Sequence, residues 1–163
     1  MRTIQTWRKF WRSSDYDRKI AFQAAIALLA TRAGLRLRGF RRWQTLLGRF
    51  TPQHMRHIDA KYFMEDEMLP GSPPAIAKMG EAVARLLPFE PTCLEKSLAI
   101  WWLLRRHRIP ADLRIGVRKD AAGNFEAHAW VEVDGVVQGE WGEDSTRFVP
   151  LEGEIQSLGT QSR

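Results

Sequence analysis

The sequence is poor in thiols, because Cys93 is the only cysteine among 163 residues. A single cysteine excludes a disulfide within the chain and fits a protein of the reducing cytoplasm. It also excludes zinc sites built from several cysteines. Histidines are nearly as few, and His54 and His57, three residues apart, have no further ligand close in sequence. We interpret both as surface or packing residues, and we expect neither a metal nor a cofactor.

Long hydrophobic runs are also missing. The apolar stretch from Ile20 to Ala30 is a good helix former bounded by charge, but it is too short to span a bilayer. It lacks the small-residue cleavage pattern of a signal peptide. Hydrophobic residues make up 44% of the chain and charged residues 27%. This composition is ordinary for a soluble globular protein and predicts one compact domain.

Acidic residues are scarce in the first 50 positions. This segment holds twelve Lys and Arg but only Asp15 and Asp17, whereas the remainder carries a net charge of minus four. Its pattern is helical. Three interpretations stay open: a solvated helical face, a surface for an anionic membrane or nucleic acid, and a docking site for an acidic peptide or partner.

The clearest break in the chain is the Pro- and Gly-rich stretch from Leu69 to Pro74. It divides a basic helical region over residues 1–70 from a core over 75–155. A disordered tail is expected over 156–163. Periodicity predicts a helix from Ala75 to Leu87. One side of that helix carries Ile76, Met79, Gly80, Val83, Leu86 and Leu87.

Cys93 stands at a predicted helix start. Thr92, followed three residues later by Glu95, makes a capping box, so Thr92 is the expected N-cap and Cys93 the first helical residue. Arg105 and Arg106 suit the helix end. Unpaired N–H groups and the positive end of the helix dipole favour a thiolate there, and later an oxyanion. The alternative is a buried structural cysteine, the commoner role of a free thiol.

The residues after this helix alternate with a period of two, which predicts strands over Ala111–Arg118 and Phe125–Val133. Lys119–Asn124 is the expected turn between them. Asp134-Gly135 is a strong hairpin signal before a third strand, Val136–Gln138. The predicted fold class is therefore α+β, with the helix that bears the candidate nucleophile packed on an antiparallel meander.

His128 is the candidate general base for Cys93. It lies outside the aliphatic stripe of its strand, where it could face the helix start. The alternative is a half-exposed strand histidine with no role. The aliphatic face carries Ala127, Ala129, Val131 and Val133, and the other face carries His128, Trp130 and Glu132.

A third residue should orient the imidazole. The carboxylates available after the hairpin are Glu140, Glu143 and Asp144. A two-residue turn sets His128 opposite Trp141 and puts Glu140 on the wrong face. Glu140 can serve only if a longer turn, or a bulge at Gly139, shifts the register by one residue.

Several blocks of this sequence resemble a known group of enzymes. They are Pro91–Ala99, Ile109–Arg118, Ala127–Glu132 and the ending Arg147–Leu151. Over about residues 85 to 151 the chain resembles the leader peptidases of lasso-peptide biosynthesis, which belong to the transglutaminase-like group of papain-type cysteine proteases. The blocks occur in the right order, which makes the resemblance specific.

The resemblance implies a transglutaminase- or papain-like core in which Cys93 is the nucleophile and His128 its base. Glu140 stands at about the position where the family usually has an aspartate, and Asp144, or no acid, stays an alternative. It further implies removal of the leader from a ribosomally made precursor, before an ATP-dependent macrocyclase acts. No strand-rich module precedes the core, so a separate leader-recognition protein is the expected partner, and no nucleic acid is expected.

Two other functions stay open. One is a non-enzymatic basic helical adaptor for a membrane or nucleic acid, favoured by a sequence pI of about 10.0. Against nucleic-acid binding, aromatic residues are not interleaved with the arginines of the basic segment, as base stacking would require. The other is acyl transfer to an amine by the same thiol chemistry. A peripheral membrane contact is compatible with each of these functions.

Overall fold

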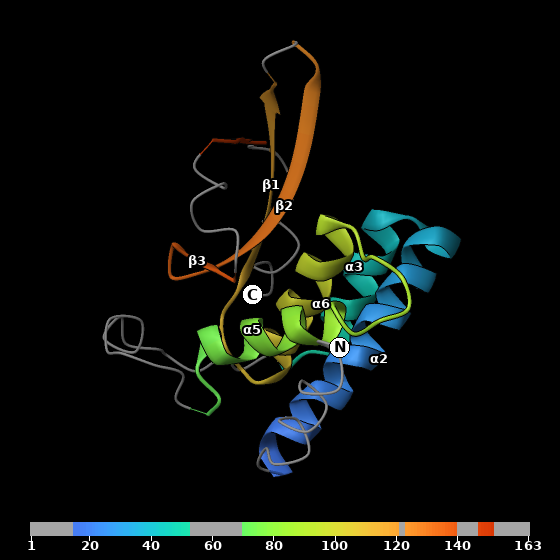
Figure 1. Ribbon diagram of the computed structural model, residues 1–163, viewed down its shortest axis with the longest axis vertical. Coiled ribbons are helices and arrows are strands. Elements are labelled where there is room, and N and C mark those ends of the chain that lie inside the picture. The colour runs from blue at the N-terminus through green and yellow to red at the C-terminus, as the bar shows by residue number, and fades with distance from the viewer. Residues whose placement is uncertain (1–14, 53–69, 121–122, 140–146, 152–163) are drawn as a thin grey trace, which may run out of the picture.

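The computed structural model describes residues 15–52, 70–120, 123–139 and 147–151. These residues form four helices and four strands, so the predicted α+β fold class is confirmed. The helices gather at one end of the molecule, and the long hairpin of the first two strands extends beyond them (Figure 1). The elements are α2 (Asp15–Arg38), α3 (Phe40–Arg49), α5 (Pro73–Ala84), α6 (Cys93–Arg106), β1 (Asp112–Lys119), β2 (Phe125–Val133), β3 (Val136–Gln138) and β4 (Val149–Pro150). Outside the described residues lie His54, His57, Glu140, Glu143 and Asp144.

The strands form one antiparallel sheet in the order β3-β2-β1-β4. The first three are the predicted meander, with β1 shifted by one residue from its predicted bounds. Val133 pairs with Val136 across Asp134 and Gly135, which both have positive φ, 54° and 76°. This is the predicted two-residue hairpin. The short β4, which pairs with β1 near Gly116, was not predicted.

The tight hairpin decides one of the two alternatives for Glu140. The turn has only two residues, so the prediction of a longer turn that shifts the register is wrong. The β2–β3 pairing ends at Val131 and Gln138, and Gly139 has a φ of 95°. A Cβ on Gly139 would overlap the carboxylate of the buried Glu81. Only glycine fits this close, left-handed position, where the chain leaves β3.

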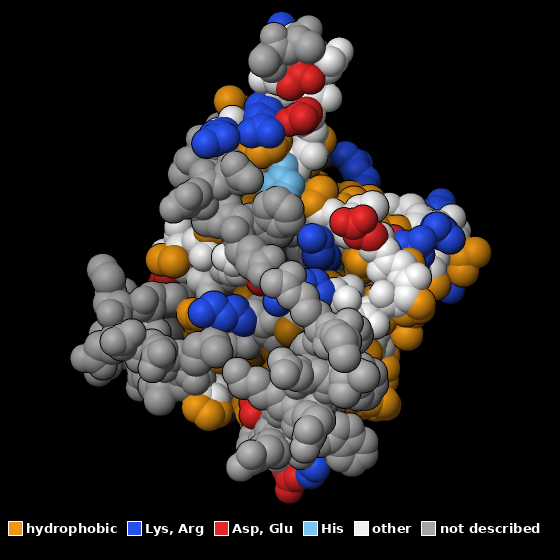
Figure 2. Space-filling model, in the orientation of Figure 1, with side chains coloured by type: hydrophobic (Ala, Val, Ile, Leu, Met, Phe, Trp, Pro, Cys, Tyr) orange, Lys and Arg blue, Asp and Glu red, His pale blue; other side chains and the backbone are white. Residues whose placement is uncertain are grey.

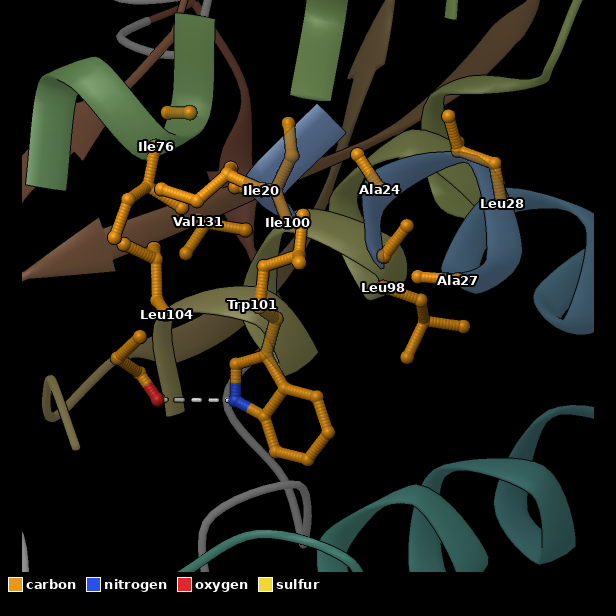
Figure 3. Packing of buried hydrophobic residues seen from close by; sticks show 14 of the residues in the cluster. Ile20, Ala24, Ala27, Leu28, Ile76, Leu98, Ile100, Trp101, Leu104 and Val131 are labelled. Atoms are coloured by element: carbon orange, nitrogen blue, oxygen red, sulfur yellow. Dashed lines mark hydrogen bonds between the residues drawn. The ribbon is translucent and has the colours of Figure 1, made fainter. Parts of the chain in front are cut away.

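Helix α6 is the centre of the molecule. It packs against β2 on one side and against α2 and α5 on the other. Fully burying one Leu or Ile side chain contributes roughly 1.5–3 kcal/mol, so this core holds the helix firmly. Trp101 adds a hydrogen bond of 2.9 Å from its Nε1 to the carbonyl of Ala111 (Figure 3). The core includes Ile20, Ala24, Leu28, Ile76, Leu98, Leu103, Leu104, Val131 and Val133.

Helix α2 is much longer than the apolar stretch from Ile20 to Ala30, because it runs for 24 residues from Asp15 to Arg38. By length and composition alone it could cross a membrane, so the expectation that this segment is too short does not hold for the whole helix. One face of the helix nevertheless belongs to the core, where Ala24 and Leu28 are buried. A buried core helix passes the same length and composition test.

The start of α5 differs slightly from the prediction. Ser72 is its N-cap, and the Ser72 hydroxyl accepts a hydrogen bond of 3.4 Å from the N–H of Ala75. Pro73 takes the first helical position, where its missing N–H costs nothing. The helix therefore begins two residues before the predicted Ala75 and ends at Ala84, three residues before the predicted Leu87. Its buried side includes Ile76, Gly80 and Val83, as predicted.

Candidate active site

The predicted capping box is present at the start of α6. The Thr92 hydroxyl accepts a hydrogen bond of 3.2 Å from the N–H of Glu95. In return, Glu95 Oε2 accepts one of 2.8 Å from the N–H of Thr92. Cys93 is the first helical residue and is half-buried. Its thiol therefore lies at the positive end of the helix dipole, where the N–H groups of the first turn can bind an anion.

A second contact holds this helix start from the side of α2. Arg32 Nη1 lies 3.4 Å from Glu95 Oε2, and the Arg32 guanidinium lies 4.1 Å from the ring centroid of Phe89. Phe89 belongs to the segment just before Thr92. The Glu95 side chain is only 8% exposed and that of Arg32 26%, so water screens this pair weakly. One arginine thus fixes both sides of the first turn of α6.

The edge of β2 next to His128 is open to α6. The N–H of Leu151 donates to the carbonyl of Ile115, which therefore points towards β4 and away from β2. Ile115 stands opposite Ala129. Ile115 and Ala129 are therefore a pair that is not hydrogen-bonded to each other. In an antiparallel ladder the backbone groups of such a pair point away from the partner strand, so the Ala129 carbonyl points away from β1. Among the described residues, β3 pairs with β2 on that side only over Val131–Val133.

Ser97 of α6 takes the place that a longer β3 would occupy. Its hydroxyl donates a buried hydrogen bond of 2.8 Å to the Ala129 carbonyl. Cys93 lies four residues before Ser97, on the same side of the helix and ~6 Å along its axis. His128 is the residue next to Ala129. One direct hydrogen bond therefore joins the helix turn that follows Cys93 to the part of β2 that carries His128.

His128 is buried, with 8% of its surface exposed, so the expectation of a half-exposed side chain is wrong. Its ring is nearly parallel to that of Trp130, with 6.3 Å between centroids, and lies 5.1 Å from that of Phe148. Trp130 is itself fixed by a 2.8 Å hydrogen bond from its Nε1 to Glu132. Two aromatic neighbours therefore restrict the orientation of the imidazole.

Gly116 makes room for these aromatic neighbours. It stands opposite His128 in the β1–β2 ladder. A Cβ on Gly116 would lie 2.9 Å from the Trp130 ring, 2.9 Å from the Val149 carbonyl oxygen and 3.0 Å from the Phe148 Cβ. A side chain at this position would push away the segment that covers His128. Glycine inside a strand is typical of such a close approach.

Sequence reasoning missed three residues of this arrangement. Ser97 is the only hydroxyl side chain in α6, and a lone hydroxyl in an apolar helix signals a buried polar contact. Gly116 interrupts the alternation of β1, which also could have been noticed. Arg32 gives no such signal, because it is one of many arginines in the basic segment.

The structure leaves part of the predicted site untested. Glu140, with its alternatives Glu143 and Asp144, lies outside the described residues, and so does Trp141. Across the parts of the chain that the structure describes, no group of three or more His, Cys, Asp or Glu is placed to hold a metal ion. The described part of the site therefore consists of the start of α6, the adjacent part of β2 and the residues that hold them.

Comparison with known proteins gives one match. A family model described as the transglutaminase-like superfamily matches residues 25–153. No curated protein and no solved structure matches the chain. The matched range begins inside α2 and includes α6 and all four strands, and with them Cys93 and His128. Members of this superfamily are typically cysteine-dependent enzymes.

Proposed function

Because the chain belongs to the transglutaminase-like superfamily, we propose that it is a cysteine peptidase that removes the leader from a ribosomally made lasso-peptide precursor. One observation carries the peptidase assignment. The only thiol is the first residue of a capped helix, one turn from a hydrogen bond to the strand that bears His128. The substrate class rests on the blocks around Cys93, Ile109 and His128 that resemble lasso leader peptidases.

In the first half of the reaction, the His128 imidazole takes the proton of the Cys93 thiol. The sulfur attacks the scissile carbonyl carbon, and the N–H groups at the start of α6 donate to the resulting oxyanion. The C–N bond then breaks, and the imidazolium gives its proton to the departing amine of the core peptide. The leader is left as a thioester on Cys93.

In the second half, His128 takes a proton from water as the hydroxide attacks the thioester carbonyl. The C–S bond breaks, the leader leaves as a free acid, and the thiol regains its proton. The amine freed in the first half is the group that a separate ATP-dependent macrocyclase joins to a side-chain carboxylate. Leader removal therefore comes before ring closure.

We further propose that the protein acts with a partner and uses a third site residue. A separate leader-recognition protein presents the precursor in the cytoplasm. Glu140 is proposed to orient the His128 imidazole. Glu140→Gln should then lower the cleavage rate more than Asp144→Asn. The reverse order would transfer this role to Asp144.

The test is a cleavage assay with the precursor, its recognition protein and the intact chain, read by product masses. The wild type should yield the free leader acid and the core peptide, whose masses together exceed the precursor by one water. Cys93→Ala should leave the precursor intact. Cleavage at the wild-type rate by Cys93→Ala would remove the thiol from the mechanism. A leader joined to an added amine, without free acid, would make the protein an acyltransferase.

Histidine substitutions supply a matched control in the same assay. His128→Ala should abolish cleavage, because no group would accept the thiol proton. His107 stands at the opposite end of α6, where its ring is 3.1 Å from Gln23 Oε1. His107→Ala removes an imidazole from the far end of the same helix and leaves Cys93 and His128 unchanged. Equal losses in the two variants would argue against a specific role for His128.

A further inference from the structure

Helix α2 presents an apolar stripe to solvent along the face opposite the core. Phe22 is 68% exposed, Ile26 47%, Leu29 50% and Leu37 82%. These residues and the exposed Ala33 follow a spacing of three or four residues, so they align along one side of the helix. Hydrophobic side chains line the right-hand edge of the molecule, where α2 runs (Figures 1 and 2).

This stripe is not the face that α2 uses for folding. The residues that pack against α5 and α6 include Ile20, Ala24 and Leu28, which lie on the other side of the helix. From Phe22 to Leu37 the stripe extends ~22 Å at 1.5 Å per residue. Monomeric soluble proteins rarely expose a contiguous apolar patch of this kind without a use for it.

The charges beside the stripe are mostly positive. Exposed cations flank it at both ends, Arg18 and Lys19 at the start and Arg36 and Arg38 at the end. Two acidic residues, Asp15 and Asp17, lie in the first turn of α2, before the stripe, and Asp15 is paired with Arg18. From residue 18 to residue 50, through the whole of α3, the sequence has eight Lys and Arg and not one Asp or Glu. A second copy of this surface would therefore be repelled.

We propose that the stripe of α2, namely Phe22, Ile26, Leu29, Ala33 and Leu37, docks the protein on an anionic lipid surface. An apolar helix face bordered by Lys and Arg is the composition of helices that lie in the membrane interface. The apolar side chains enter the boundary between headgroups and acyl chains, while the flanking cations meet lipid phosphates. The opposite face of α2 stays packed in the core, so docking needs no unfolding.

The test is flotation of the intact protein with vesicles, which requires neither precursor nor recognition partner. The wild type should float with vesicles of phosphatidylglycerol and phosphatidylcholine at about 0.1 M salt, and less so at about 1 M salt. It should stay behind with pure phosphatidylcholine. The triple variant Phe22→Gln, Ile26→Gln, Leu29→Gln should bind at least about tenfold more weakly. Circular dichroism must show the same helix content in both proteins.

Phe125→Gln is the matched control, because Phe125 is 75% exposed at the tip of the β1–β2 hairpin, far from the stripe in sequence. It should float like the wild type. Absence of flotation with anionic vesicles, or equal flotation of the triple variant, would overturn the proposal. If the wild type does not bind vesicles, and the triple variant no longer binds the recognition protein that the wild type binds, the stripe is a protein-docking surface instead. If the wild type forms dimers and the triple variant is monomeric, the stripe binds a second copy of the chain and not a lipid surface.

Discussion

The hydroxyl of Ser97 donates a hydrogen bond of 2.8 Å to the backbone carbonyl of Ala129. This bond replaces the ladder contact that β3 would make if it continued past Gln138. It fixes the first turns of α6 against the edge of β2, so Cys93 and His128 are held by elements that touch directly. We call this hydrogen bond between Ser97 and Ala129 the α6–β2 joint. In the proposed mechanism, the distance between thiol and imidazole depends on it.

Ser97→Ala tests the joint. The variant should lose about 1–3 kcal/mol of unfolding free energy, because the Ala129 carbonyl stays buried without its donor. Urea unfolding measures this change. Precursor cleavage should fall further than the fraction of folded protein does, because α6 can shift along β2. Ser72→Ala is the control, since it removes a helix cap on α5 at a cost of about 1 kcal/mol but leaves the joint intact. Equal cleavage rates in the two variants would contradict the role of Ser97.

Arg32 is predicted to stabilise the start of α6 through Glu95 and Phe89. Arg32→Met should lower the unfolding free energy by about 1–2 kcal/mol, because it leaves a buried carboxylate without its cation and removes a cation–π contact. Cleavage should slow as the first turn loosens. Arg36→Met removes an exposed cation of α2 and should change neither quantity.

Arg32→Lys separates charge from shape. A lysine restores a positive charge near Glu95 but cannot also stack a planar guanidinium on Phe89, so it should recover only part of the lost stability. Full recovery would show that charge alone matters at this position. No loss in Arg32→Met would show that the contact contributes nothing.

Gly116→Ala should destabilise the protein by about 1–3 kcal/mol, because the new methyl group meets the Trp130 ring and the backbone at Val149. Thermal unfolding measures this loss, and cleavage should fall with it as Phe148 moves off His128. Gly48→Ala is the matched control of opposite sign. A Cβ on Gly48, inside α3, would come no closer than 4.0 Å to Trp101, so helix propensity should stabilise this variant by up to about 1 kcal/mol. Similar losses in both variants would contradict the packing argument.

The local parts of the fold were predictable from the sequence. Thr92 and Glu95 predicted the start of α6 because a capping box involves residues only three apart. Asp134 and Gly135 predicted the tight hairpin because their types suit positive φ. Such signals depend on neighbours in the chain, and the structure confirms both.

The parts that join distant segments were not predictable in this way. Ser97 meets Ala129 across 32 residues, and Arg32 meets Glu95 across 63. No periodicity encodes such contacts, because they depend on how the elements pack. The full length of α2 was not predicted because its ends are charged, although the face that packs in the core is apolar along the helix. The role of Glu140 as the third residue of the site stays a prediction, because Glu140 lies outside the described residues.

In the proposed mechanism, His128 activates the Cys93 thiol. Alkylation by iodoacetamide measures this directly, because the chain has no other cysteine and the assay needs no precursor. Intact mass, followed over time at about neutral pH, gives the rate of modification. We predict that His128→Ala reacts at least about tenfold more slowly than the wild type, whereas His107→Ala reacts at the wild-type rate. Equal rates in all three proteins would contradict the account.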